Sequence, residues 1–115
     1  MHKIGVVGCG YWGPNLIRNF CESNRCKIIV CDINKNRLTM IKKRYPKVET
    51  TTSFEKLINS DVDGIVVATP ISTHFSLSKK AIECGKHILI EKPMTTSSNE
   101  ALTLIELAKR NNLVL

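Results

Sequence analysis

Residues 3–13, KIGVVGCGYWG, decide the fold of this chain, because a short apolar run there ends in three glycines spaced G-x-G-x-x-G. The segment that follows is amphipathic, and its apolar side carries Leu16, Ile17, Phe20 and Cys21. An apolar run that short favours a strand, and the helical spacing that follows favours a helix. The stretch therefore predicts a strand, a tight turn and a helix.

The three glycines have separate physical roles in this interpretation. We expect Gly8 to allow the sharp turn out of the strand, Gly10 to let phosphate groups approach bare backbone, and Gly13 to let the helix pack closely against the sheet. Pro14 fits the first helical turn, where a missing N–H costs little. Free N–H groups at that end of a helix favour an anion. A plain strand-to-helix turn is the alternative, so the rest of the chain has to supply the context.

A second strand is predicted at residues 27–31, which are apolar and β-branched, and it ends at Asp32. Asp32 lies 19 residues after Gly13, close to the place where an acidic residue takes the ribose hydroxyls in a dinucleotide-binding unit. A solvated turn carboxylate or a helix cap is the other interpretation. An acid here repels a 2′-phosphate, which favours NAD over NADP as cofactor, whereas Lys35 and Arg37 weigh against that preference.

The rest of the chain continues to alternate between helix and strand patterns. Helices are predicted at 35–45, after the capping-box sequence 52–55, from about residue 73 to Gly85, and after the capping-box sequence 97–100; strands are predicted at 48–51, 62–68 and 87–90, with a sixth opening at 113–115. The helical residues expected to face inward are Leu38, Ile41, Tyr45, Leu57, Ile58, His74, Ser78, Ala81, Ile82, Ala101, Leu104, Ile105 and Ala108. This alternation predicts an α/β protein of one domain, residues 1–115, with a doubly wound parallel sheet (Rossmann fold) in the strand order 3-2-1-4-5-6.

That strand order predicts where a ligand binds. The carboxyl ends of strands one and four adjoin at the point where the order reverses, and ligands bind there in such sheets. The glycine turn at 8–13, the pair Thr69-Pro70 and, one strand further along, Glu91-Lys92 all follow strand ends. We therefore expect three separate stretches of sequence to open on one crevice.

Composition narrows the remaining classes of function. The five cysteines are odd in number and form no C-x-x-C pair, so they indicate neither a disulfide framework nor a metal site. A net charge of +7 raises nucleic acid as a partner, but the basic residues are mostly scattered and only 5% of residues are aromatic. A solvated basic surface that helps to attract an anionic dinucleotide is the better interpretation. With no apolar run long enough to cross a membrane and no room for a signal peptide before the first strand, we expect a cytoplasmic protein with no membrane partner.

These residues together resemble the N-terminal, dinucleotide-binding domain of the Gfo/Idh/MocA oxidoreductases, which act on sugars, inositols and sugar nucleotides. The resemblance covers essentially all 115 residues. It rests on residues 8–13, Asp32, residues 68–70 with His74, residues 85–87 and, most specifically, Glu91-Lys92-Pro93. Residues 10–16 are most similar to members that work on nucleotide-linked sugars.

The resemblance implies a role for each matching residue. In the family the glycine turn and the two residues inside it hold the pyrophosphate, the acid takes the adenosine ribose, and the Thr-Pro loop lies near the nicotinamide. Carried over, cofactor binding falls on Gly8, Gly10, Tyr11, Trp12, Gly13, Asp32, Thr69, Pro70, His74, Glu91 and Lys92. Lys92 matches the catalytic or substrate-binding lysine, and no metal is implied. From its place in the sequence, His74 is expected to lie near the cofactor loop in the first turn of a helix, and not to act as a proton carrier in catalysis.

The resemblance also implies a part that these residues do not contain. Family members continue into a second α/β domain that binds substrate, forms the oligomer interface and adds an Asp/His motif to catalysis. We therefore expect this chain to be the NAD-binding domain of a dehydrogenase that transfers hydride between nicotinamide and a sugar, inositol or sugar-nucleotide carbon, and to bind cofactor alone without turnover. The complete enzyme is expected to be a homo-oligomer. A non-catalytic nucleotide-binding or regulatory module is the alternative.

Overall fold

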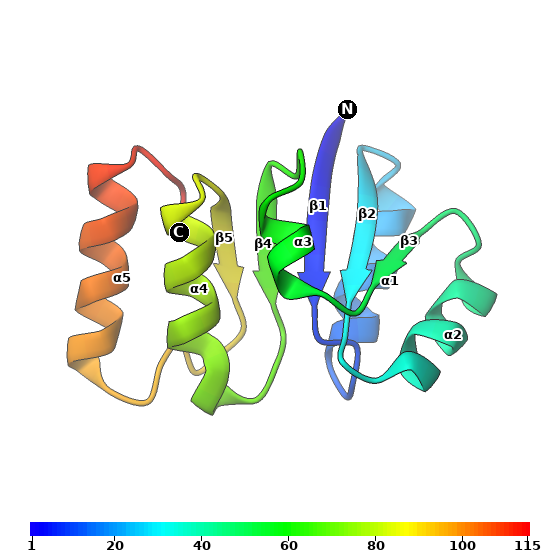
Figure 1. Ribbon diagram of the computed structural model, residues 1–115, viewed down its shortest axis with the longest axis horizontal. Coiled ribbons are helices and arrows are strands. Elements are labelled where there is room, and N and C mark those ends of the chain that lie inside the picture. The colour runs from blue at the N-terminus through cyan, green and yellow to red at the C-terminus, as the bar shows by residue number, and fades with distance from the viewer.

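All five strands of the chain lie in one parallel sheet. The computed structural model describes residues 1–115 and places β1 at His2–Val7, β2 at Cys26–Cys31, β3 at Glu49–Thr51, β4 at Gly64–Val67 and β5 at His87–Ile90. Their order across the sheet is β3-β2-β1-β4-β5, with every neighbouring pair parallel. The strands run side by side toward the lower edge of the molecule in Figure 1. The predicted Rossmann topology is confirmed over these strands.

Helices cover both faces of this sheet. They are α1 (Gly13–Ser23), α2 (Lys35–Arg44), α3 (Phe54–Ile58), α4 (His74–Glu83) and α5 (Ser98–Arg110), with a short 3₁₀ turn, η1, at Ile71–Thr73. Helices α3, α4 and α5 pack on one face, which is turned toward the viewer in Figure 1, and α1 and α2 pack on the other. None of the helices has both the length and the apolar composition needed to cross a lipid bilayer.

Two separate cores result from this layering. On β1, Val6 belongs to the core beneath α1 and α2, and the adjacent Val7 belongs to the core beneath α3, α4 and α5. Val6 aligns with Val30 of β2 and Val66 of β4, and all three are at most 2% exposed. Full burial of such a side chain contributes roughly 1.5–3 kcal/mol. This two-sided burial explains why the central strands read as continuous apolar runs.

Side chains that accept backbone N–H groups define the starts of three helices. Asn34 caps α2 and Ser97 caps α5, where its hydroxyl accepts the N–H of Glu100. The cap of α3 is Ser53, one residue later than the predicted capping box required, and it accepts the N–H of Lys56. At the other end of α4, Gly85 has φ +77°, which confirms the predicted left-handed residue there.

Two predictions in the last third of the chain are wrong. Residues 113–115 form no sixth strand: Ile88 donates to the carbonyl of Val114 at 2.9 Å, but the N–H of Val114 goes to the Nδ1 atom of His87 and that of Leu113 goes to Ala108. With the N–H of Val114 used elsewhere, a single backbone hydrogen bond joins these residues to β5, and one bond does not make a ladder. Ile105, predicted to face inward, is 38% exposed because α5 packs through its neighbours Leu104 and Ala108.

Candidate functional site

A cavity of about 1160 Å³ lies at the carboxyl ends of the strands. The loops that follow β1, β2, β4 and β5 all contribute to its walls, as does the start of α3. Of the predicted site residues it gathers Gly8, Gly10, Tyr11, Trp12, Asp32, Thr69, Pro70, His74, Glu91 and Lys92, and only Gly13 lies outside its lining. The structure thus brings the three predicted stretches of sequence to one crevice.

Gly8 and Gly13 hold the turn after β1 in place. Gly8 has φ +92°, and a Cβ atom on it would lie 2.6 Å from the carbonyl oxygen of Ala68. A Cβ atom on Gly13 would collide with the carbonyl oxygen of Gly8 and lie 2.8 Å from its carbonyl carbon. Gly13 therefore allows α1 to begin directly against the turn itself, and both positions exclude any side chain.

Gly10 faces a more adaptable neighbour. A Cβ atom there would meet the guanidinium of Arg37 at 3.1 Å, the end of a flexible side chain that extends from α2. Just beyond it, Tyr11 is 95% exposed and Trp12 is 48% exposed, so both rings stand at the rim. No side chain caps the start of α1 and its first turn carries no acid, so the N–H groups there are not used by the chain's own side chains.

Asp32 is held by the chain itself at the end of β2. Its Oδ2 atom accepts the backbone N–H of Cys9 at 3.0 Å, and its Oδ1 atom accepts that of Asn34 at 2.8 Å. The guanidinium of Arg37 lies 3.9 Å from Oδ2. Burial alone raises the pKa of the Asp32 carboxyl, but the hydrogen bonds from Cys9 and Asn34, with the charge of Arg37, outweigh it and lower that pKa below its usual value.

These contacts remove the two alternatives for Asp32. The residue is 7% exposed, so it is not a solvated turn carboxylate, and Asn34 caps the following helix in its place. What remains is a buried negative charge at the wall of the cavity. A charge in that position favours a ligand that offers hydroxyl donors.

Two buried thiols lie close to this carboxylate. Burial, together with the charge of Asp32 and the hydrogen bond from the thiol to it, raises the pKa of Cys9 to about 12. Burial and the Asp32 charge raise the pKa of Cys31 to about 11. Both thiols therefore stay protonated at neutral pH, and they behave as small buried side chains.

The loops after β4 and β5 form the other side of the cavity. The hydroxyls of Thr69 and Thr73 lie 2.6 Å apart, and Thr73 also donates to the carbonyl of Pro70 at 2.7 Å. The N–H of Glu91 donates to Val67 at 3.0 Å and so continues the pairing of β5 with β4. Lys92 lines the cavity, and its side chain forms no hydrogen bond or ion pair.

His74, in contrast to Lys92, is fully engaged. The residue is 2% exposed, and its Nε2 atom lies 2.8 Å from the carbonyl oxygen of Thr69. Its Nδ1 atom lies 2.9 Å from the carbonyl oxygen of Pro93 and 3.2 Å from that of Met94. The ring thus bridges the loops after β4 and β5 from the first turn of α4.

Sequence reasoning missed several residues of the cavity. Arg37 was considered only for cofactor preference, and its side chain instead covers Gly10. Ile33 is 92% exposed at the cavity, and Phe54 lines it from the start of α3. For Ile33 the sequence offered one signal, an apolar residue directly after the acid. Phe54 offered none, because only the fold brings it to the cavity.

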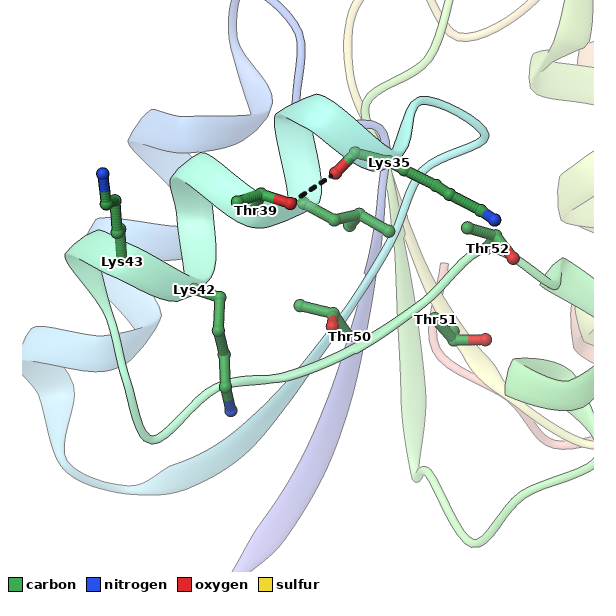
Figure 2. A pocket seen from close by; sticks show the side chains of 8 residues that line it. Lys35, Thr39, Lys42, Lys43, Thr50, Thr51 and Thr52 are labelled. Atoms are coloured by element: carbon green, nitrogen blue, oxygen red, sulfur yellow. Dashed lines mark hydrogen bonds between the residues drawn. The ribbon is translucent and has the colours of Figure 1, made fainter.

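A second, smaller cavity of about 570 Å³ lies between α2 and β3 (Figure 2). Three lysines, four threonines and Leu38 line it. Lys35 reaches toward Thr52, which also lines the larger cavity, whereas Lys43 points away. Lys42 donates to the carbonyl of Val48 at 2.6 Å, so its ammonium is already bound. No predicted site residue lines this groove, and the larger cavity remains the candidate site.

A family model described as "Oxidoreductase family, NAD-binding Rossmann fold" matches residues 2–115. The chain belongs to the Gfo/Idh/MocA oxidoreductase family. This membership confirms the resemblance that the glycine turn, Asp32 and Glu91-Lys92-Pro93 indicated. It also identifies the cavity at the strand ends as part of an NAD-binding fold.

Known members of the Gfo/Idh/MocA family show the range of its chemistry. The chain is 31% identical to UDP-N-acetylglucosamine 3-dehydrogenase of Acidithiobacillus ferrooxidans, with 98% of this chain and 35% of that protein covered. It is 29% identical to the NADP-dependent scyllo-inositol 2-dehydrogenase IolW of Bacillus subtilis, with 98% and 32% covered. The crystal structure of GenD2 from gentamicin A biosynthesis, in complex with NAD, superposes with a TM-score of 0.94 at 28% identity over 99% of this chain and 33% of that one. The chain thus spans about a third of the length of these relatives.

Proposed function

We propose that residues 1–115 are the cofactor-binding part of a dehydrogenase that transfers hydride between a nicotinamide and a hydroxyl-bearing carbon of a sugar-type substrate, with a sugar nucleotide favoured. The observation that carries the proposal is the single cavity in which the glycine turn, Asp32, the Thr69-Pro70 loop and Lys92 meet. Relatives that act on a UDP-sugar and an inositol support this substrate class.

The residues present fit a dinucleotide. The backbone at Gly10 carries no side chain, and the start of α1 keeps its N–H groups free of side-chain caps, which suits a pyrophosphate. Asp32 would accept a hydrogen bond from a ribose hydroxyl, and the loop at Thr69-Pro70 would hold the nicotinamide end. When bound, the nicotinamide supplies the carbon that accepts or donates the hydride.

Lys92 is the residue that we propose meets the reacting hydroxyl. Its Nζ atom has no partner within the chain, and the residue lines the cavity directly after Glu91. In the reduction direction the Lys92 ammonium would donate a proton to the substrate oxygen, and in the oxidation direction the neutral Lys92 amine would accept the hydroxyl proton. In a protein that carries both this chain and the substrate domain, Lys92→Met is expected to lower kcat by about 10² to 10⁴. Unchanged turnover in that variant would remove Lys92 from the mechanism.

Cofactor choice is the part of the proposal that depends most on charge. The buried Asp32 carboxylate disfavours a 2′-phosphate, and Arg37 at 3.9 Å offsets only part of that charge. We propose NAD as the cofactor, with NADP bound more weakly. Arg37→Ala removes the cation that offsets the charge of Asp32, so this variant is expected to widen the preference for NAD.

Calorimetry on the 115-residue chain tests the proposal directly. Wild type is titrated with NAD and with NADP, and Asp32→Ala is compared with Asp61→Ala, a surface variant that removes only the contact of Asp61 with Lys3. We expect NAD binding to be lost in Asp32→Ala and kept in Asp61→Ala. A folded wild-type sample that binds neither cofactor would refute the proposal.

Binding without dehydrogenase activity in the protein that carries this chain would favour the alternative, a non-catalytic nucleotide-binding module. A cytoplasmic location and a homo-oligomeric enzyme stay predictions.

A further inference from the structure

His74 has an unusual set of hydrogen-bond partners for a buried histidine. Its Nε2 atom faces the carbonyl oxygen of Thr69, and its Nδ1 atom faces the carbonyl oxygens of Pro93 and Met94, all between 2.8 and 3.2 Å. Carbonyl oxygens only accept hydrogen bonds. A neutral imidazole has one N–H, so its other nitrogen would point a lone pair at a carbonyl oxygen.

The doubly protonated ring resolves this conflict, because it donates from both nitrogens. The ring is buried, and the three carbonyl oxygens around it accept both of its N–H groups. No charged side chain does so: residues 69–73 contain no titratable group, and neither Glu91 nor Lys92 of the loop after β5 forms a hydrogen bond or ion pair with the ring. On α5, Glu100 is bound by the hydroxyl of Thr96.

The ring also supplies the hydrogen bonds that join the two loops. No other hydrogen bond connects residues 69–73 with residues 92–94. The carbonyls that accept from Nδ1 belong to the two residues directly after Lys92. Their position sets the course of the backbone at Lys92 itself, relative to the loop that follows β4.

We propose that His74 is a positioning residue whose imidazolium, donating from both ring nitrogens, holds the Glu91-Lys92-Pro93 loop against the Thr69-Pro70 loop and so places Lys92. The role assigned to Lys92 rests on the proposed function. The protonation state and the link between the loops do not, because they concern only contacts within this chain.

The ring nitrogens can be observed without any ligand. The 115-residue chain, labelled with ¹⁵N in histidine, gives a long-range ¹H–¹⁵N spectrum near pH 7. We expect both nitrogens of His74 to show the shift of protonated nitrogen. His87 is the internal reference, because its Nδ1 atom accepts the N–H of Val114 at 3.0 Å and must carry a lone pair. A neutral-tautomer pattern at His74, like the one expected at His87, would overturn the proposal.

A pH titration then tests the link to Lys92. Any change in the ¹⁵N signals of the His74 ring with pH is expected to be accompanied by shifts of the amide signals of Lys92 and Met94 that have the same midpoint. The variant His74→Gln, which does not titrate, is expected to abolish that shared transition, and His87→Gln is the matched control that leaves it in place. Amide shifts of the loop that do not follow the ring would refute the positioning role. If His74→Gln does not fold, the wild-type ring and amide titrations still decide the question, and a failure of NAD binding leaves both readouts unaffected.

Discussion

Replacement of Asp32 by asparagine tests how much this residue contributes to the stability of the fold. Asp32→Asn keeps the size of the side chain, removes its charge and turns one of its two oxygens into an NH₂ donor. In the wild type each oxygen accepts a separate backbone N–H, from Cys9 at 3.0 Å and from Asn34 at 2.8 Å. An asparagine can satisfy one of these donors and must present its own N–H groups to the other.

The expected loss of stability follows from the one backbone donor that asparagine leaves without an acceptor. A hydrogen bond to a charged group contributes about 1.5–3 kcal/mol, and a buried donor left without an acceptor costs about 1–3 kcal/mol. Loss of one such bond at a site that is 7% exposed therefore predicts that Asp32→Asn lowers the free energy of unfolding by about 2–3 kcal/mol at neutral pH. That is a substantial part of the roughly 5–15 kcal/mol that stabilises a typical domain.

The same loss should depend on pH in a defined direction. Because the pKa of Asp32 is lower in the folded chain than its ordinary value of about 3.9, its carboxylate contributes its full stability above that value. The contribution is lost as the pH falls through the unfolded and then the folded pKa. The difference between wild type and Asp32→Asn should thus be largest near neutral pH and shrink below about pH 4.

Urea unfolding followed by far-UV circular dichroism, at pH 7 and near pH 3, measures this difference. Asp61→Asn is the matched control, since that carboxylate is exposed and contacts only Lys3 at the surface. A loss below about 0.5 kcal/mol at pH 7, or one of the same size at both pH values, would refute the account of Asp32 as a carboxylate held by backbone donors. The measurement also decides how cofactor binding by Asp32 variants is to be interpreted, because part of any lost affinity would come from unfolding.

Three further predictions follow from the glycines and the thiols. Gly10→Ala should weaken NAD binding at least about tenfold in calorimetry with little change in unfolding free energy, because only a flexible guanidinium end lies near the new methyl group. Gly13→Ala should lower the free energy of unfolding in urea by more than about 3 kcal/mol, because its Cβ atom meets backbone atoms. Gly85→Ala should lower it by only about 1–2 kcal/mol, because this residue has φ +77° but open space around it. Equal losses at the two sites would contradict both predictions. At neutral pH a thiol reagent should label the exposed Cys84 at once and Cys9, whose pKa is raised to about 12, only after denaturation, as mass spectrometry of the labelled peptides would show.

Much of this fold could be predicted because its signals are local. Strands covered on both faces read as short apolar runs, and the alternation with helices leaves few topologies once crossovers are right-handed. The sixth strand failed as a prediction because apolar residues at 113–115 say nothing about where their N–H groups go. Here the N–H of Leu113 closes the end of α5 and that of Val114 reaches a histidine ring.

The candidate site, like the fold, could be predicted where a local sequence pattern determines it and not where contacts between distant residues do. The glycine spacing and Asp32 were predicted from the sequence, and the structure brings them into one cavity. The contacts that set their properties were not predictable, because they join residues far apart in the chain. Arg37 over Gly10, and His74 between Thr69 and Pro93, follow no sequence pattern.

The hydrogen-bond donors that already bind the Asp32 carboxylate limit the choice of cofactor more closely than its charge alone does. A carboxylate has about four lone-pair sites, and the chain fills three of them with the N–H of Cys9, the thiol of Cys9 and the N–H of Asn34. One acceptor position remains, which suits a single ribose hydroxyl and offers nothing to a phosphate. One donor that a 2′-phosphate could use is the guanidinium of Arg37, which already lies 3.9 Å from the carboxylate. A cofactor with a 2′-phosphate would therefore have to draw Arg37 away and leave the buried carboxylate without its cation, and this cost supports the proposed preference for NAD. Arg37→Ala removes the donor altogether, so it is expected to widen that preference.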